Sequence, residues 1–354
     1  MTLDYSCGLK STLQVVASSA RKAVPASRRN ATVITITGMT NSARAQEIVM
    51  SSFRSFLLVI TLLQCACPVV HGDESVRRIE DVVYGRKSGM ALTLDVFQPE
   101  KPNGCSLLFL VNGGWLSSKD TPKMVTIRPD DYRLYLARGY SVFAVVTSSQ
   151  PKFAIPEQME DVQRAVRYVR TNAAKFGVRP DRLGVLGSSS GGQLTLSIAT
   201  QGGPGNADSP DPVERESSAV QAAACFFPPT DFLNYGGRGI SGVGEGPLAP
   251  LKAAFGPRAL TQEGRESLGR EISPIYFVTA HVPPTLIIHG DADKAVPLQQ
   301  SESFVKRAKD AGAPHVELIV RPGKGHGWGD FWKSTEDITA FADWFDRHLR
   351  DRSD

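Results

Sequence analysis

Short apolar runs alternate with longer amphipathic stretches along most of the chain. The run at residues 91–97 alternates apolar and polar side chains, which predicts an edge strand. Continuous apolar runs, typical of strands covered on both faces, occupy residues 106–111, 140–146, 182–187, 220–227, 285–290 and 316–322. Stretches with helical spacing lie at about 129–138, 157–175, 190–201, 297–312 and 333–349. This exchange of strands and helices predicts an α/β fold, with a mostly parallel sheet covered by helices on both faces.

Residues 228–282 interrupt this alternation, because they are rich in Gly and Pro and too long for a simple connection. Two interpretations are open: a disordered insertion and a cap that covers a site. The segments "LKAAFG" and "SPIYFVTAHV" carry enough apolar side chains to pack. We therefore predict a partly ordered cap insertion within one domain that spans residues 73–354.

The first 72 residues differ from the rest of the chain. Residues 1–49 are rich in Ser, Thr, Ala and Arg without periodicity, and we interpret them as a non-structural leader or a mis-assigned start. Residues 50–72 hold one arginine, Arg54, followed by an uncharged run and a small-residue end, which is typical of a secretory signal peptide. This pattern predicts a secreted or periplasmic protein. The alternative is a membrane-anchored protein, held by an uncleaved signal or by a lipid on Cys65.

Charge and cysteine content exclude several classes of function. The chain has a net charge of +4, but residues 1–72 hold seven of its 40 Lys and Arg residues and two of its 36 acidic residues. The remaining 33 basic and 34 acidic residues predict no nucleic-acid partner. Cys105 and Cys225 alone follow residue 72, which excludes a disulfide framework and leaves one optional bridge open. The sequence holds no metal-binding motif, and we expect no metal and no cofactor.

A candidate nucleophile lies in "GVLGSSSGGQL" at residues 184–194. Ser189 is the middle residue of a G-x-S-x-G string that follows a predicted strand and precedes a predicted helix. The glycines have a purely steric interpretation as well, because a sharp strand-to-helix turn brings backbones close together. In the catalytic interpretation, Ser190 contributes its backbone N–H at the start of the helix.

A candidate acid and a candidate base follow the last two predicted strands. The segment "IIHGDADKAVP" presents Asp291 and Asp293, which are either turn formers or a source of the acid. His326 lies between glycines in "PGKGHGW", on a loop where a base can reach across the sheet edge. The chain order Ser189, Asp293, His326 matches the α/β-hydrolase order rather than that of chymotrypsin or subtilisin.

Residues 76–349 resemble an α/β-hydrolase of the esterase and lipase kind. The chain is similar to secreted acetylxylan and feruloyl esterases of the BD-FAE type, and to the catalytic domain of prolyl oligopeptidases. The motifs that carry this resemblance are "MEDVQRAVRYVRTNAAKFGVRPDRLGVLGSSSGGQL", "SPI", "PPTLIIHGDADKAVPLQQS" and "PGKGHGW". The resemblance implies that the later carboxylate, Asp293, is the acid of a Ser-His-Asp triad.

The resemblance also implies an oxyanion hole in "VNGGW" at residues 111–115. The family usually has His-Gly-Gly-Gly-Trp there, so Val111 and Asn112 depart from its pattern. Gly113 and Gly114 remain, and with Ser190 their backbone N–H groups are the expected oxyanion donors. Trp115 is the expected substrate-binding residue.

These residues predict a serine hydrolase that cleaves carboxylic esters through an acyl-enzyme. The expected substrates carry short acyl groups, free or linked to a polysaccharide. One alternative is a serine peptidase like the prolyl oligopeptidases, although residues 73–105 are too few for the β-propeller that such peptidases usually carry. The other is a non-catalytic binding module on the same scaffold. Membrane contact is expected only through an uncleaved signal or lipid anchor.

Overall fold

The computed structural model describes residues 76–118, 129–329 and 331–350. The chain divides into two compact units, Met1–Val70 and His71–Asp354, and all described residues belong to the second. The interpretations given to residues 1–49 and 50–72 therefore lie outside the described residues.

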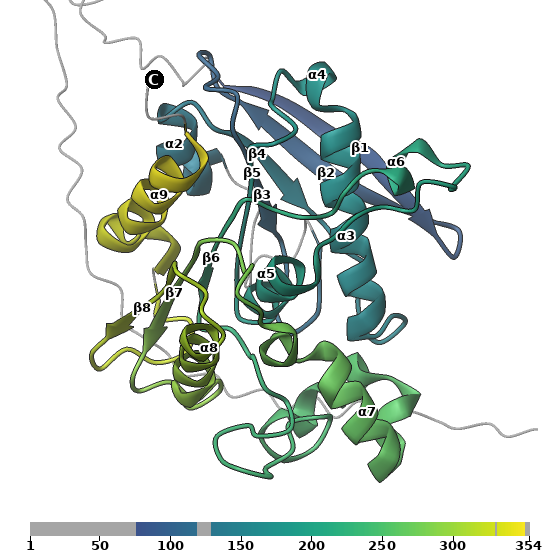
Figure 1. Cartoon of the computed structure of the whole chain (residues 1–354), viewed down its shortest axis with the longest axis vertical. Helices are drawn as coiled ribbons and strands as arrows, with labels where there is room; N and C mark the ends of the chain where they lie inside the picture. Colours follow the sequence, from purple (N-terminus) through teal and green to yellow (C-terminus); the bar gives the residue numbers. More distant parts are fainter. Residues whose placement is uncertain (1–75, 119–128, 330, 351–354) are drawn as a thin grey trace, which may run out of the picture. The chain divides into compact units, whose positions relative to one another are not determined.

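The described residues form one eight-stranded sheet with the order β1-β2-β4-β3-β5-β6-β7-β8 (Figure 1). β2 pairs antiparallel with both β1 and β4, and all other neighbours pair in parallel. The strands are β1 (Arg77–Lys87), β2 (Met90–Gln98), β3 (Ser106–Leu110), β4 (Ser141–Val145), β5 (Leu183–Ser188), β6 (Ala222–Phe226), β7 (Thr285–Gly290) and β8 (Val316–Arg321). The predicted α/β fold with a mostly parallel sheet is confirmed.

The predicted strands are present with ends that shift by at most two residues. Every residue of β3 to β7 is buried, as expected for continuous apolar runs between two layers. The prediction of β2 as an edge strand is wrong, because β1 lies outside it. β1 escapes prediction because its sequence, RRIEDVVYGRK, is mostly polar and its register shifts twice, which breaks the alternation of period two.

Helices cover both faces of the sheet (Figure 1). α2 (Pro129–Ala137) and α9 (Thr335–Leu349) pack on one face, around Tyr132 and Phe341. The other face holds α3 (Ile155–Thr171), α5 (Ser190–Gln201) and α8 (Gln299–Asp310). The helix predicted at 157–175 is interrupted at Asn172, which ends α3 with φ −102° and ψ 16° before the short α4 (Ala173–Phe176). The four-residue α6 is Pro212–Arg215.

Residues 228–282 consist of short helices joined by turns. These are η2 (Gly246–Phe255), η3 (Pro257–Leu260), α7 (Gln262–Ile272) and η4 (Pro274–Phe277). Phe232, Val243 and Leu268 from this segment are fully buried in the hydrophobic core that also contains Trp115. The segment is therefore folded onto the core, while its role as a cap stays a prediction.

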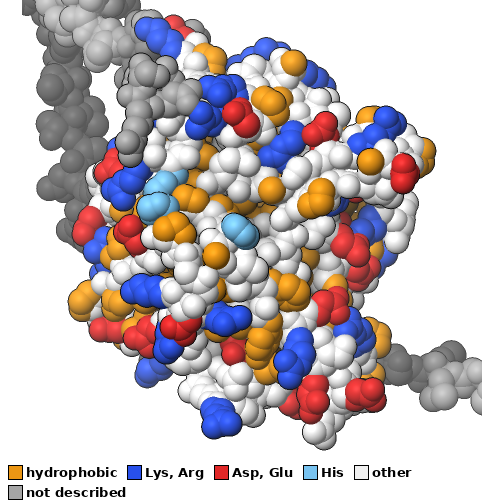
Figure 2. All heavy atoms as spheres, in the orientation of Figure 1, with side chains coloured by type: hydrophobic (Ala, Val, Ile, Leu, Met, Phe, Trp, Pro, Cys, Tyr) orange, Lys and Arg blue, Asp and Glu red, His pale blue; other side chains and the backbone are white. Residues whose placement is uncertain are grey.

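Charged side chains of both signs lie on the surface of the described residues. On the face shown in Figure 2, basic and acidic side chains are interspersed, and neither sign gathers into one large patch. None of the helices in the described part of the chain combines the length and apolar character that a membrane crossing requires. Cys105 and Cys225 are both buried and are not joined to each other, so the optional disulfide is absent.

Candidate active site

Ser189 lies in a sharp turn between β5 and α5. Its backbone has φ 54° and ψ −120°, a conformation that L-residues rarely adopt and that exposes the side chain at the end of the strand. The turn requires the glycine at 187, because a Cβ there would stand 2.5 Å from the carbonyl oxygen of Gly191. The steric interpretation of the glycines is therefore correct, and it is compatible with an exposed serine hydroxyl.

The structure brings Ser189, His326 and Asp293 together. The Ser189 Oγ lies 3.0 Å from Nε2 of His326, and Nδ1 of His326 lies 2.7 Å from Oδ2 of Asp293. The three residues follow β5, β8 and β7, respectively. Because these strands are parallel, their carboxyl ends share one edge of the sheet, which is where ligands bind in open α/β sheets.

The carboxyl of Asp293 is buried yet surrounded by donors. Its Oδ1 accepts from the backbone N–H groups of Ala295 and Val296, both at 2.9 Å. Its Oδ2 faces His326 at 2.7 Å and His289 at 3.4 Å. Burial favours the neutral acid, but the hydrogen bonds from His289, His326 and the backbone outweigh it and hold the pKa of Asp293 well below its usual range. The group is therefore a carboxylate at neutral pH.

Asp291, the other candidate acid, is exposed and has a different partner. Its Oδ1 accepts from the backbone N–H of Gly323 at 2.6 Å, which ties together the loops after β7 and β8. The structure thus separates the two carboxylates, and Asp293 alone contacts the ring of His326.

One of the three predicted oxyanion donors, the N–H of Gly113, already has a partner in the loop. The Gly113 N–H donates to the carbonyl of Leu116 at 2.9 Å, so the turn consumes this donor. Among the described residues, no acceptor takes the N–H of Gly114, and Ser190 is the first residue of α5, where a helix leaves its N–H groups unpaired. The expectation for Gly113 is therefore wrong, whereas Gly114 and Ser190 keep donors for an oxyanion.

Asn112, the residue that departs from the family pattern, is buried at the centre of a polar network. Its Oδ1 accepts from the Ser190 hydroxyl at 2.7 Å. Its Nδ2 donates to Oε1 of Gln158 at 3.0 Å and to the Thr147 hydroxyl at 3.2 Å. The side chain thus joins the loop before Gly113 to the first residue of α5, which are the two segments that carry the remaining candidate oxyanion donors.

Trp115 does not occupy the position expected of a substrate-binding side chain. It is 1% exposed, packs against Phe232 and Phe255, and donates from Nε1 to Oε1 of Gln193 at 3.1 Å. Gly114 and Trp115 both have φ 59°, and this pair of left-handed residues turns the indole into the core. The substrate-binding expectation for the Trp115 side chain is wrong, because the indole is packed into the core.

Sequence reasoning missed the buried polar residues that support the site. Gln158 also donates to the Trp115 carbonyl at 3.0 Å, and Gln193 donates to the carbonyl of Ile272 at 3.0 Å, which ties the segment 228–282 to α5. The available signal was the presence of glutamines at buried positions of amphipathic helices. The aromatic contact of His326 was also missed. The ring of Phe227 lies with its centroid 4.6 Å from that of His326.

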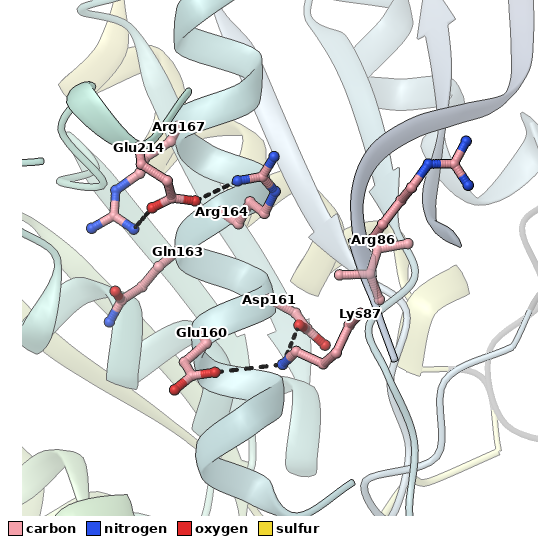
Figure 3. Close-up of a pocket in the computed structure, with 9 residues that line it drawn as sticks. Arg86, Lys87, Glu160, Asp161, Gln163, Arg164, Arg167 and Glu214 are labelled. Carbon is pink, nitrogen blue, oxygen red and sulfur yellow. Dashed lines mark hydrogen bonds and ion pairs between the residues drawn. The ribbon is translucent and has the colours of Figure 1, made fainter. Parts of the chain in front are cut away.

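A cavity of about 260 Å³ lies between β1 and α3, and none of Ser189, Asp293 and His326 lines it (Figure 3). Its charges are paired within the protein: Lys87 lies 2.7 Å from Asp161, and Arg164 and Arg167 both contact Glu214. Arg86 points away from the other side chains in Figure 3. The described residues also hold no cluster of three His, Cys, Asp or Glu that could bind a metal ion. Neither observation competes with the Ser189 edge as the candidate site.

Comparisons with known proteins identify the family of the chain. The BD-FAE family model matches residues 94–308. Esterase LipQ of Mycobacterium tuberculosis is 28% identical over 257 residues, covering 70% of this chain and 56% of that protein. Esterase LipC of the same organism is 29% identical over 268 residues, covering 73% of this chain and 59% of that protein. The chain thus spans little more than half the length of these curated relatives.

Among solved structures, a truncated form of a carbohydrate esterase from gut microbiota is similar to this chain. The TM-score is 0.65 at 25% sequence identity, and the match covers 78% of this chain and 98% of that one. With the strand order given above, these similarities establish the α/β-hydrolase fold.

Proposed function

Because the chain belongs to the BD-FAE family of α/β-hydrolases, we propose that it is a carboxylic ester hydrolase that acts through Ser189, His326 and Asp293. The observation that carries this proposal is the continuous relay of 3.0 Å and 2.7 Å from the serine hydroxyl to a buried carboxylate. A hydroxyl, an imidazole and a carboxylate in this order are the groups that acyl transfer by serine requires.

In the acylation step, Nε2 of His326 takes the proton of Ser189 as Oγ attacks the ester carbonyl. Asp293 holds the ring in the tautomer that leaves Nε2 free to accept this proton. The N–H groups of Gly114 and Ser190 donate to the developing oxyanion, and removal of one such donor costs about 10²- to 10³-fold in rate in other serine hydrolases. His326 then gives the proton to the leaving alcohol, and the acyl group stays on Ser189.

In the deacylation step, water replaces the alcohol. His326 takes one proton of the water while the water oxygen attacks the acyl carbonyl. The carboxylic acid then leaves as His326 returns the proton to the Oγ of Ser189. The chain's own residues supply every group that this sequence of steps needs.

Short-chain acyl groups, free or linked to a polysaccharide, are the proposed substrates. The similarity to a carbohydrate esterase supports the polysaccharide-linked class. Export by the segment 50–72, with a membrane anchor as the alternative, remains part of the proposal and rests on sequence alone. N-terminal sequencing of the natural protein tests it: a mature chain that starts near Asp73 supports export, and one that starts within residues 2–49 contradicts it.

Hydrolysis of p-nitrophenyl esters from acetate to octanoate by the full chain tests the activity directly. We expect the highest kcat/KM with acetate. Ser189→Ala should lower kcat by about 10⁶-fold without changing the thermal unfolding midpoint, because the nucleophile is lost and the core is untouched. Ser188→Ala, one residue earlier in β5, is the matched control and should keep most of the activity. A folded wild type without turnover, or full turnover by Ser189→Ala, would contradict the proposal.

A further inference from the structure

His289 is a fully buried histidine that the ester hydrolysis described above leaves without a role. It lies in β7, one residue before the strand ends at Gly290, and its side chain is 0% exposed. A polar ring in such a position needs hydrogen-bond partners, because an unpaired buried polar group costs about 1–3 kcal/mol. The partners of this ring connect it to the candidate active site.

The contacts of the two ring nitrogens define where the ring carries its hydrogen. Nε2 lies 2.9 Å from the carbonyl oxygen of Val296 and 3.4 Å from Oδ2 of Asp293. A carbonyl and a carboxylate can only accept, so Nε2 must carry the hydrogen that points at them. Nδ1 lies 2.7 Å from the hydroxyl of Ser301, a buried residue in the first turn of α8, and accepts from it in this tautomer.

Asp293 is consequently held between two imidazoles on the same oxygen. His326 approaches Oδ2 from the loop after β8, and His289 approaches it from within β7. The other oxygen is fixed by the backbone N–H groups of Ala295 and Val296. Rotation of the carboxylate away from His326 would therefore break contacts on both oxygens.

We propose that His289, itself oriented by Ser301, is a positioning residue that holds Asp293 in the orientation that serves His326. This inference rests on the proposed ester hydrolysis. It adds two contacts to the relay, from Asp293 to His289 and from His289 to Ser301 at the start of α8. His289 does not touch the substrate or the reacting atoms in this assignment. It acts through Asp293, and it can therefore matter only while Asp293 is a carboxylate that His326 uses.

Three variants separate the contacts of His289. His289→Phe fills the site with a ring that has no donor, and we expect kcat to fall about 10- to 100-fold with KM little changed, by analogy with groups that orient histidine ligands at metal sites. His289→Gln keeps an N–H donor and should recover part of the loss. Ser301→Ala removes only the partner of Nδ1 and should cost less than His289→Phe. His281→Phe, the same change at an exposed histidine before β7, is the matched control and should stay within about twofold.

A double-mutant cycle distinguishes a positioning role from a purely structural one. If His289 acts through Asp293, His289→Phe should change the residual kcat of Asp293→Asn by less than about threefold, since interacting sites are not additive. An equal loss in both backgrounds would overturn the proposal. Circular dichroism and thermal melts of each variant show whether the fold survives.

A second readout does not depend on activity. The proton between His326 Nδ1 and Asp293 gives a downfield NMR resonance when that hydrogen bond is short and ordered. We expect the resonance in the wild type and in His289→Gln, and its broadening or loss in His289→Phe; an unchanged resonance in His289→Phe would overturn the proposal. If the folded wild type hydrolyses no ester, the proposed function fails, while this resonance still decides the role of His289.

Discussion

Two pairs of histidines in this molecule have opposite surroundings. His289 and His326 both face the carboxylate of Asp293 at the carboxyl edge of the sheet. His315 and His348 face one another near the end of α9, with ring centroids 5.4 Å apart, and within the described residues no hydrogen bond or ion pair joins either ring to a carboxylate. The pairs thus compare the same side chain with and without a buried acid.

The difference appears in the ionisation of each region. At the first pair, donors outweigh burial and hold the pKa of Asp293 well below its usual range. At the second pair, burial together with His315 and Arg347 lowers the pKa of His348 to about 4. The rings of the first pair thus share an ionised acid, whereas His348 is partly buried beside His315 and Arg347.

Among changes around the two histidine pairs, removal of the Asp293 carboxylate should have the largest effect on kcat. Asp293→Asn should lower kcat by about 10⁴-fold, because an amide no longer fixes the tautomer of His326. Asp291→Asn is the matched control, and we expect a change of less than about twofold because Asp291 is exposed and contacts Gly323 instead of His326. Equal losses in the two variants, measured as kcat on p-nitrophenyl acetate, would contradict the assignment of the acid.

A smaller effect is expected from the neutral polar network beside the relay. Asn112→Ala should lower kcat about 10- to 100-fold by loosening the loop that carries the Gly114 donor. It should also lower the free energy of unfolding by about 1–3 kcal/mol, since Gln158 and Ser190 lose buried partners.

Ser190→Ala is a milder change in the polar network of Asn112 and serves as its control. It keeps the backbone N–H and removes one hydrogen bond to Asn112, so its loss in kcat should be smaller than that of Asn112→Ala. Urea unfolding and kcat measured together separate the two consequences. A loss of stability with unchanged kcat in Asn112→Ala would show that the network holds the fold alone.

The smallest effect on activity is expected at the second histidine pair. The folded-state pKa of His348, about 4, lies below its usual value of 6.5, so the unfolded chain binds more protons between these pH values. His348 therefore favours unfolding progressively as the pH falls through this window, and has no such effect above it. His348→Gln should lessen the loss of stability between pH 6.5 and about 4 and leave kcat at neutral pH unchanged. Urea midpoints across the window check this, and curves that coincide with the wild type would contradict it.

The sequence predicted the strands and the order of the site residues because both depend on local pattern. Continuous apolar runs identify buried strands, and a serine, an acid and a base at the ends of parallel strands must meet at one edge. β1 escaped prediction because its polar, irregular edge sequence carries no such pattern.

The sequence pattern did not predict the hydrogen bonds and side-chain orientations of the loop at residues 111–115. Trp115 was expected to bind substrate, but the positive φ values at Gly114 and Trp115 turn the indole into the core. The N–H of Gly113 is consumed by a turn to Leu116, which no composition or spacing indicates. Hydrogen bonds between distant residues, such as Ser190 to Asn112 and His289 to Ser301, depend on the packed structure.

Covalent trapping of the nucleophile tests the proposed relay most directly. The full chain and its His326→Ala variant are incubated with a p-nitrophenyl phosphonate, whose phosphorus is attacked by an activated serine, and the adduct is located by peptide mass spectrometry. We expect one equivalent of label on Ser189 in the wild type, released with one equivalent of p-nitrophenol, and almost none in His326→Ala. Label on another residue, or equal labelling of Ser189 without His326, would contradict the assignment of Ser189 as a nucleophile activated by His326.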